Sequence, residues 1–330
     1  MNTNPSVATS VEELLSLRID ALRLVRASKK RVQRQQTGPR ASRSLGRGLD
    51  FAESRIYQPG DDVRNMDWNV TARTGVAHSK LFVEEREKPT LLMIDLSPGM
   101  WFATRGMFKS LLVTRMAALL AWCAVSSNDR VGGIVSTGSW QREVPAEPGR
   151  RGVMALIRYL VEAREHITAN DKNADASTVN QSAHQFSQSL QQLQKLSRSG
   201  GDVVVLSDFA SLDAQPDEAG RSGTLSVTGK PTRSEVQTRL ASLAQSASLT
   251  LVHAYDPIEK SLPVGGHLEV VQNGVRSLLA QSGRRSEQHA ERFSMRTDTL
   301  QSLAAAGGRI GYAQVDTTEK PADALQRLLQ

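Results

Sequence analysis

Hydrophobic residues recur at helical spacing close to the N-terminus of the chain. The apolar positions of this stripe are Val11, Leu15, Ile19 and Leu22. Ser10 precedes the stripe and Glu13 lies three residues further on, which is the spacing of a helix-capping box. The pattern predicts a helix from Ser10 to about Gln36. Its first half should pack on the body of the protein, because the stripe fades where basic residues become frequent.

Strands and helices alternate in the pattern after Pro89. Short runs rich in Val, Ile and Leu predict strands over 91–94, 129–135, 202–206, 249–254 and 309–315. Longer stretches predict helices over 107–126, 151–165, about 181–199, 234–247, 286–306 and 321–330. Near-continuous apolar strands separated by helices are typical of a parallel sheet that is covered on both faces. The expected fold class is therefore α/β, with a mostly parallel sheet and helices on both faces.

The segment before this sheet is rich in charged residues and turn formers. It has a strong turn at Pro59–Asp62 and short extended pieces predicted over 70–74 and 80–84. We therefore expect a basic N-terminal helix and linker over 1–40, a charged irregular or β segment packed on the body over 41–89, and an α/β domain over 90–330. Within that domain we expect polar insertions near 166–180 and 211–233 and a hairpin around Asn273-Gly274.

Composition places limits on the class of protein. With 330 residues, of which 39% are hydrophobic, the chain can bury one α/β domain and an appendage. Its single cysteine, Cys123, lies in an apolar helical pattern, which predicts a buried structural thiol in a reducing compartment. The N-terminus lacks the pattern of a signal peptide, and the longest apolar run, Met116–Val125, is too short to span a bilayer. We therefore expect a cytoplasmic protein without a transmembrane segment.

Positive charge is concentrated near the N-terminus. The formal net charge of the chain is +7, and the segment from Arg18 to Arg55 has eleven Lys and Arg residues against three acidic ones. Such a segment suits nucleic acid, an anionic membrane or an acidic protein, or it is a solvated helix face and linker. Nucleic-acid binding through residues 18–55 is thus the alternative function, although aromatic residues for base stacking are not interleaved with the basic ones.

Two acidic residues are expected at the carboxyl ends of strands, where ligands gather in parallel sheets. Asp95 follows the strand predicted over 91–94, and Asp208 follows the one predicted over 202–206. Asp95 and Ser97 can present a carboxylate and a hydroxyl from one loop to a hard cation such as Mg²⁺. The alternative is structural, with Asp95 capping the next helix or accepting hydrogen bonds from loop amides. Both interpretations stay open at this point.

Several sequence motifs follow one another in a fixed order between about Leu45 and the C-terminus. They are GRGLDFAESRIYQPGDDVRNMDW, TARTG, EER, LLMIDLS, NDRVGGIVS, VVVLSDF and AYDPIEKSLP. This set resembles the prokaryotic domain-of-unknown-function family 58, a relative of the von Willebrand factor A domains. The resemblance implies a von Willebrand A-like, Rossmann-like fold. It also implies a non-enzymatic interaction module, an adaptor or co-chaperone that acts with a MoxR-type AAA+ ATPase in the assembly or maturation of client proteins.

The resemblance further implies a metal-ion-dependent adhesion site. Von Willebrand A domains use Asp-x-Ser-x-Ser in one loop, a threonine in a second and an aspartate in a third. Asp95, Ser97 and Asp208 match this pattern, but Gly99 replaces the second serine and His184-Gln185 stand where the threonine is expected. The resemblance therefore implies a degenerate site for weak binding of Mg²⁺ or another divalent cation.

The charged segment supplies the candidate interaction residues. They are Arg55, Tyr57, Asp61, Asp62, Arg64, Asp67, Trp68, Arg73, Lys80, Glu85 and Arg86. In a structural role, their charges pair with one another while Tyr57 and Trp68 anchor the loops by burial. In a functional role they form a docking surface, where Arg and Trp are frequent hot spots. Both roles are compatible, because docking is helped by a rigid loop.

Overall fold

The computed structural model describes residues 9–35, 49–84, 89–170, 176–213, 233–262, 267–272, 275–280, 283–306 and 308–328. The chain divides into two compact units. The first, which we call the hairpin unit, is Arg31–Glu87. The second, the sheet unit, comprises Met1–Lys30 together with Lys88–Gln330. The sheet unit is therefore discontinuous in sequence. The predicted packing of 41–89 on the body stays a prediction.

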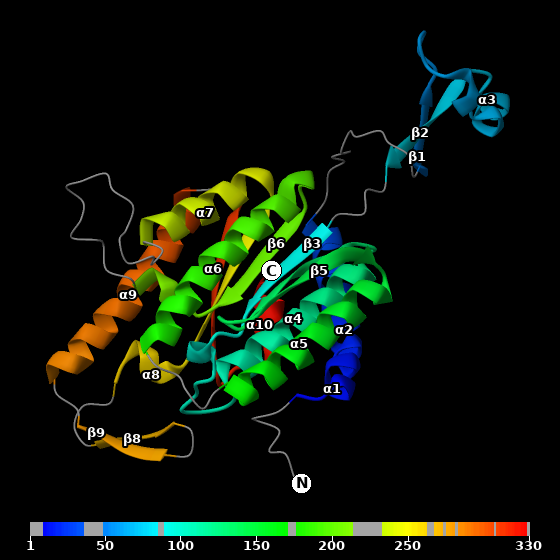
Figure 1. Cartoon of the computed structure of the whole chain (residues 1–330). Helices are drawn as coiled ribbons and strands as arrows, with labels where there is room; N and C mark the ends of the chain where they lie inside the picture. The colour runs from blue at the N-terminus through cyan, green and yellow to red at the C-terminus, as the bar shows by residue number, and fades with distance from the viewer. Residues whose placement is uncertain are drawn as a thin grey trace. The chain divides into compact units, whose positions relative to one another are not determined.

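A six-stranded sheet forms the centre of the sheet unit (Figure 1). Its order is β10-β7-β6-β3-β4-β5. The strands are β3 Pro89–Asp95, β4 Arg130–Ser136, β5 Gln141–Pro148, β6 Asp202–Ser207, β7 Ser248–Tyr255 and β10 Ile310–Asp316. Neighbouring strands are parallel except for β4 and β5, which are antiparallel. The predicted α/β class and mostly parallel sheet are confirmed.

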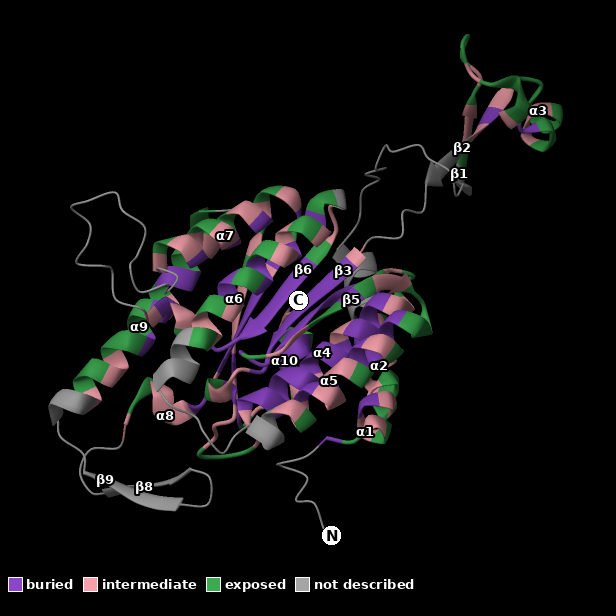
Figure 2. Ribbon diagram, in the orientation of Figure 1, coloured by how far each residue is buried: buried purple, intermediate pink, exposed green. Residues whose placement is uncertain are grey.

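Helices cover both faces of this sheet (Figure 1). One layer consists of α1 Val11–Ser16, α2 Arg18–Gln35, α4 Lys109–Ser126, α5 Arg150–Asn170 and α10 Pro321–Leu328, and the other of α6 Ala176–Leu196, α7 Arg233–Ser246 and α9 Gly283–Ala306. Along β3, Leu92 and Ile94 join the core under the first layer, whereas Leu91 and Met93 join the core under the second. Figure 2 shows the strands as a buried layer between the helices. The strands read as continuous apolar runs because both of their faces are buried.

The N-terminal helix predicted from Ser10 to about Gln36 is divided at Leu17 into α1 and α2, and α1 packs against α4 and α5, as expected for its first half. Ser10 caps α1 by accepting a hydrogen bond from the backbone N–H of Glu13. Leu14 is fully buried, and its carbonyl accepts a hydrogen bond of 3.1 Å from the indole of Trp122 on α4. Glu13 forms an ion pair of 2.6 Å with Arg115 on the same helix.

Helix α4 lies in the core of the sheet unit. Among the described residues it is the one helix that is long and apolar enough to cross a membrane, but 78% of it is buried inside the fold. Its Cys123 is a free thiol, and burial raises the pKa of this thiol to about 12. Cys123 is therefore a structural residue, as expected, whereas the cytoplasmic location stays a prediction.

The hairpin unit is built on strands β1 Leu49–Ile56 and β2 His78–Glu84, which pair antiparallel. A 3₁₀ turn, η1 Val63–Asn65, and helix α3 Trp68–Thr74 connect them. The extended piece predicted over 70–74 was wrong, because this stretch is helical. Asp67 starts the helix by accepting a hydrogen bond of 3.2 Å from the N–H of Val70, and this cap overrides the β-branched residues.

Other local predictions met mixed outcomes. The predicted hairpin near Asn273-Gly274 is confirmed by the antiparallel strands β8 His267–Gln272 and β9 Val275–Ala280, although residues 273–274 lie outside the described residues. Most of the insertion predicted near 211–233 also lies outside them. Helix α6 begins at Ala176, within the stretch predicted as a loop. Strand β5 was not predicted, because it is an edge strand with one buried residue, Val144, and has no apolar run.

Gly133 provides a test of the sheet packing. Its φ is +144°, and a side chain there would overlap the carbonyl oxygen of Leu92 on β3. We expect Gly133→Ala to lower the free energy of unfolding by at least about 2 kcal/mol in urea denaturation. Gly308→Ala is the matched control, because a methyl group at Gly308 would meet no atom within 4 Å. Equal stabilities of the two variants would contradict this account of β3 and β4.

Candidate functional site

Asp95 and Asp208 meet at the carboxyl edge of the sheet. Asp95 is the last residue of β3, and Asp208 directly follows β6, the neighbouring parallel strand. The hydroxyl of Ser207 donates a hydrogen bond of 2.6 Å to Oδ2 of Asp95. Both aspartates are buried, with 6% and 3% of their surface exposed. The structure therefore brings together the two acidic residues that the sequence singled out.

Loop amides bind the remaining oxygens of these two carboxylates. The N–H of Ser97 donates to Oδ1 of Asp95 at 2.9 Å, and the N–H of Ala210 donates to Oδ1 of Asp208 at 3.0 Å. The structural alternative for Asp95, hydrogen bonding to loop amides, is therefore present in the structure.

Lys109 is the cation of this site. It is the first residue of α4 and is 1% exposed. Its Nζ lies 2.8 Å from Oδ2 of Asp208 and 2.7 Å from Oε1 of Glu259 on the short helix α8, Pro257–Lys260. Oε2 of Glu259 accepts a hydrogen bond of 2.9 Å from the N–H of Asp256, which completes a capping box and fixes the carboxylate.

A second cation approaches from the opposite helical layer. Arg296 on α9 donates from Nη1 to the backbone carbonyl of Asp208 at 2.8 Å and from Nε to Oδ1 of Asp213 at 3.0 Å. We call Asp95, Lys109, Asp208, Glu259 and Arg296 the buried charge cluster. It joins the ends of β3 and β6 to helices of both layers.

The electrostatics of the buried charge cluster shift the pKa values of the two aspartates in opposite directions. Burial, and then the nearby charge of Asp208, raise the pKa of Asp95 to about 6. Burial acts in the same direction on Asp208, but the Lys109 ammonium and then the Arg296 guanidinium outweigh it and hold the pKa of that carboxyl well below its usual range. Burial lowers the pKa of Lys109, but Asp208 and Glu259 more than reverse this effect. At neutral pH Lys109 is therefore protonated and Asp208 is ionised.

These properties limit what the cluster can do chemically. A protonated ammonium held by two carboxylates is neither a nucleophile nor a general base. The Ser207 hydroxyl uses its single proton to bond Asp95 and accepts from the N–H of Phe209 at 2.9 Å, so it is held in a structural role. His253, at the end of β7, is neutral, because burial and then the charge of Arg296 lower its pKa to about 3. The arrangement is suited to fixing loops.

The cluster is a poor fit for the divalent cation that the sequence suggests. All four carboxylate oxygens of Asp95 and Asp208 already accept a hydrogen bond. Lys109 and Arg296 place two positive charges beside Asp208, and these repel a dication. Within the described ranges, no group of three or more His, Cys, Asp or Glu side chains is placed to hold a metal ion. His184, at the expected threonine position, lies on α6 and bonds Gln188.

Some candidate interaction residues of the hairpin unit stabilise its backbone, and others are exposed on its surface. Asp67 is buried and accepts a hydrogen bond of 2.5 Å from the hydroxyl of Ser54, so it is a scaffold residue. Arg55 pairs with Asp61 at 2.6 Å, and Asp61 also accepts from the N–H of Gln58, which closes the predicted turn. Asp62 caps η1 by accepting from the N–H of Arg64 at 2.9 Å.

Trp68 departs from its predicted role. It was expected to anchor the loops by burial, but it is the first residue of α3, and 66% of it is exposed. Tyr57 and Lys80 are half-buried. Arg64 and Arg73 are exposed and form no ion pair with the part of the chain that the structure describes. Glu85 and Arg86 lie outside the described residues.

The basic segment from Arg18 to Arg55 is only partly described at the side-chain level. Within that part, Arg23 pairs with Asp20 at 3.2 Å and Arg18 lies over the ring of Trp122 at 5.8 Å. Arg55 pairs with Asp61. These three arginines make intramolecular contacts, whereas Arg26 is exposed.

Comparison with known proteins places the chain in a family. A family model described as "Protein of unknown function DUF58" matches residues 53–298, which is most of the chain. The chain belongs to the DUF58 family. The chain is similar to uncharacterized protein Mb1516 of Mycobacterium bovis and to uncharacterized protein Rv1480 of Mycobacterium tuberculosis. It is 37% identical to each of them over 115 residues. The match covers 35% of this chain and 36% of each relative, so the chain spans about a third of their length.

The DUF58 match begins in β1 and ends in α9, so it contains most of the described hairpin unit and the whole buried charge cluster. Sequence reasoning found Asp95 and Asp208 but missed their partners. For Glu259 a signal was available, since Asp256-Pro-x-Glu259 has the spacing of a capping box. For Lys109 the signal is a basic residue in the first turn of a helix, where acidic residues are favoured. Arg296 lies among other charged residues of α9 and has no local signal.

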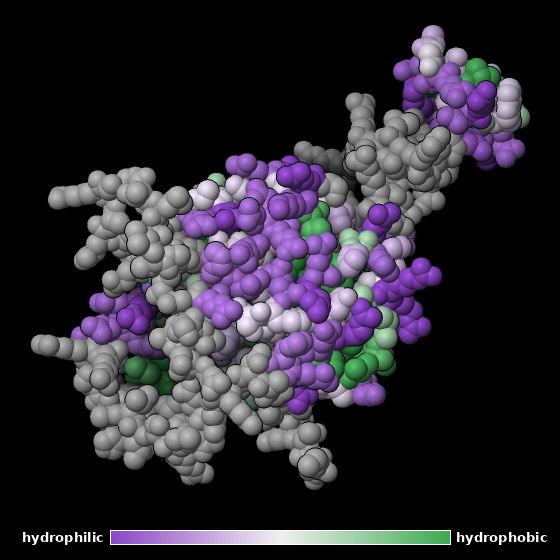
Figure 3. Space-filling view, in the orientation of Figure 1, coloured by the Kyte–Doolittle hydropathy of each residue, from purple (hydrophilic) through white to green (hydrophobic). Residues whose placement is uncertain are grey.

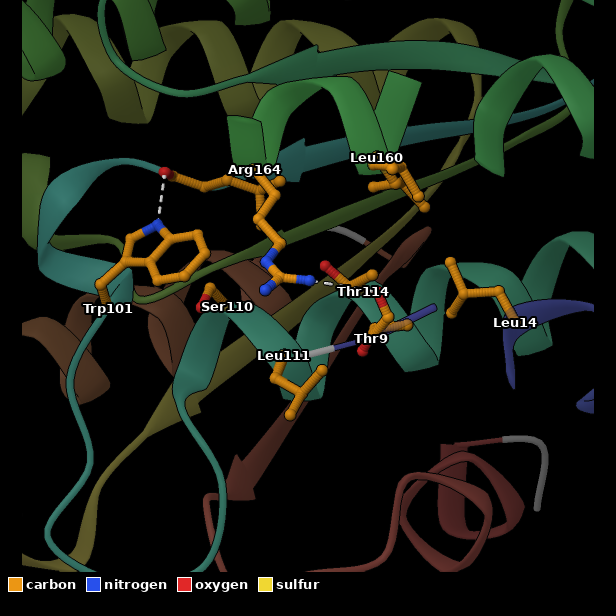
Figure 4. Close-up of a pocket in the computed structure, with 10 residues that line it drawn as sticks. Thr9, Leu14, Trp101, Ser110, Leu111, Thr114, Leu160 and Arg164 are labelled. Carbon is orange, nitrogen blue, oxygen red and sulfur yellow. Dashed lines mark hydrogen bonds between the residues drawn. The ribbon is translucent and has the colours of Figure 1, made fainter. Parts of the chain in front are cut away.

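A cavity beside the Asp95 loop is too small for a substrate. It has a volume of about 30 Å³ and lies among α1, α4 and α5, with Leu96 and Trp101 of the loop in its wall. Figure 4 shows Arg164 reaching toward Thr9, whose carbonyl accepts a hydrogen bond of 3.4 Å. In the same view, the indole of Trp101 donates to the carbonyl of Leu96 at 3.3 Å. The space has room for a water molecule.

Substitution of Lys109 tests the energetics of the DUF58 charge cluster. Lys109→Met leaves the buried Asp208 and the partly buried Glu259 without their cation, which should lower the free energy of unfolding by about 3–5 kcal/mol. The exposed Lys195→Met on α6 is the control and should change it by less than about 0.5 kcal/mol. Adding Glu259→Gln to Lys109→Met should recover part of the loss, measured by urea unfolding. Similar effects at Lys109 and Lys195 would contradict the proposed role of the ammonium.

The raised pKa of Asp95 gives a pH-dependent prediction. Between the ordinary pKa of 3.8 and about 6, the folded chain keeps a proton on Asp95 that the unfolded chain releases, so this residue lowers stability as the pH rises. Asp95→Asn removes this penalty. The free energy of unfolding of the variant, relative to the unsubstituted chain, should increase by on the order of 1–3 kcal/mol between pH 4 and 7. The exposed Asp298→Asn is the control, and a pH-independent difference for Asp95→Asn would refute the assignment.

Proposed function

We propose that this DUF58 protein is a non-enzymatic interaction module, an adaptor or co-chaperone that works with a MoxR-type AAA+ ATPase in the assembly or maturation of client proteins. The partner follows from the resemblance of its motifs to a family related to the von Willebrand A domains. The observation that supports an interaction role is the surface of the hairpin unit. Of the seven large hydrophobic residues that are exposed among the described residues, four belong to this small unit: Ile56, Val63, Trp68 and Val76.

These side chains are exposed on a firmly held backbone. The exposed fractions are 62% for Ile56, 59% for Val63 and 66% for Trp68. Strand pairing holds the backbone at Ile56, and the cap at Asp67 holds it at Trp68. In Figure 3, hydrophobic side chains of the unit lie among hydrophilic ones. A fixed backbone favours binding, because fewer degrees of freedom are lost when a partner docks.

Arginine and tryptophan are the residue types that most often dominate interface energies. Arg64 and Arg73 lie close to Trp68 in sequence, are exposed, and have no partner in an ion pair within the described part of the chain. A partner surface with an apolar pocket and neighbouring carboxylates would match this combination. We therefore propose that Trp68 and Arg73 make the main contacts, while Asp67 and Arg55 hold the scaffold.

The test is binding to a purified AAA+ ATPase that co-purifies with the tagged chain from its native host and is identified by mass spectrometry. Trp68→Ala and Arg73→Ala should each weaken the affinity, measured by titration calorimetry, by at least about tenfold. Circular dichroism should be unchanged, because both side chains are exposed. Met154→Ala, an exposed apolar residue on α5, is the matched control and should bind normally.

Three outcomes would count against the proposal. Failure of any AAA+ ATPase to co-purify with the intact chain would remove the proposed partner. Equal affinities for all the variants would show that the hairpin unit is not the docking surface. Salt-sensitive binding of the chain to DNA or RNA, with no ATPase bound, would favour the nucleic-acid alternative.

A further inference from the structure

Lys109 lies at a place where a positive charge is unfavourable unless nearby negative charges compensate for it. As the first residue of α4 it faces the positive end of the helix dipole, and it is almost completely buried. Burying an ammonium costs several kcal/mol unless carboxylates compensate for the lost hydration. The ammonium of Lys109 has two such carboxylates, Asp208 at 2.8 Å and Glu259 at 2.7 Å. These two carboxylates therefore make the buried position of the Lys109 ammonium energetically acceptable.

The ammonium links three loops at the carboxyl edge of the sheet. Lys109 ends the connection that follows β3, Asp208 begins the one that follows β6, and Glu259 lies in the one that follows β7. These three strands are neighbours in the sheet order. Joining carboxylates from different loops at one point is the usual structural role of a bound divalent cation.

Gly99 explains why the ammonium fits there. A Cβ at position 99 would lie 3.3 Å from Oδ2 of Asp208, the oxygen that accepts the hydrogen bond from Lys109. This distance is shorter than an ordinary van der Waals contact. A side chain at this position would therefore crowd the oxygen that binds the ammonium. The glycine and the lysine are thus complementary features of one arrangement.

We propose that the Lys109 ammonium is a built-in cation that takes the place of a divalent metal at the carboxyl ends of β3 and β6. Loop geometry at this edge is then independent of Mg²⁺ and Mn²⁺. It also follows that the edge holds a latent metal site. Removing the ammonium frees Oδ2 of Asp208, and a serine at position 99 adds a hydroxyl oxygen beside it, so oxygen ligands suited to such a cation become available next to Asp95. This inference does not depend on the proposed adaptor function.

The experiment compares the unsubstituted chain with the double variant Gly99→Ser/Lys109→Ala, with MnCl2 as the only probe. Binding is followed by electron paramagnetic resonance of free Mn²⁺, and stability by the thermal unfolding midpoint in EDTA and in millimolar MnCl2. The unsubstituted chain should bind no Mn²⁺ and should unfold at the same temperature in both solutions. The double variant should unfold at a lower temperature in EDTA and should be stabilised by Mn²⁺ in a saturable manner.

Two further variants make the result specific. Gly99→Ala/Lys109→Ala lacks the added hydroxyl and should bind Mn²⁺ at least about tenfold more weakly than the serine variant. Adding Asp208→Asn to the serine variant should abolish the effect of Mn²⁺, because Asp208 is the carboxylate that the ammonium now holds.

The proposal is overturned by either of two results. The first is Mn²⁺ binding by the unsubstituted chain that Asp208→Asn abolishes, because the metal and the ammonium would then coexist. This measurement requires no variant of Lys109 and so does not depend on whether such a variant folds. The second is a Gly99→Ser/Lys109→Ala variant that is indifferent to Mn²⁺. A variant that remains unfolded in Mn²⁺ counts with the second result, since a cation that fills the site must restore folding.

Discussion

The sheet unit depends on the neutralisation of negative charge at the carboxyl ends of its central strands. Parallel strands direct their carboxyl ends to one edge, so Asp95 and Asp208 on neighbouring strands meet there by topology alone. Two buried carboxylates in one place are unfavourable without a cation or a proton. Lys109 from one helical layer and Arg296 from the other supply positive charge. The same interactions thereby tie both layers to the strand ends.

The helices and strands could be predicted from the sequence because they have a hydrophobic periodicity. This periodicity does not depend on the conformation of the loops, and a parallel sheet then fixes where the strand ends meet. The partners of Asp208 could not be found in this way. Lys109, Glu259 and Arg296 come from distant elements, and only packing brings them to one place. The Asp95-x-Ser97 spacing and the family resemblance suggested a metal, because the sequence does not show whether the counter-charge of a carboxylate is an ion or a side chain.

The hairpin unit shows a second limit of sequence reasoning. Asp67 and Trp68 are adjacent, and both stood out as unusual residues in a charged segment. The structure gives them opposite roles, since Asp67 is 6% exposed and Trp68 is 66% exposed. The helix start at this turn separates them: Asp67 is the N-cap, whose carboxylate bonds Ser54 and Val70, and Trp68 is the first helical residue. Such a local turn has no hydrophobic periodicity. The composition therefore singled out the segment as unusual, but it did not predict which of its side chains are buried.

The discontinuity of the sheet unit has a consequence for the order of folding during synthesis. Helix α1 is synthesised well before α4, whose Trp122 donates a hydrogen bond to the carbonyl of Leu14. The whole hairpin unit is made in between, as one continuous stretch. It can therefore close its strand pair while the N-terminal helices still lack the core they pack against. During that interval the apolar side of α1 lacks its native contacts with α4 and α5.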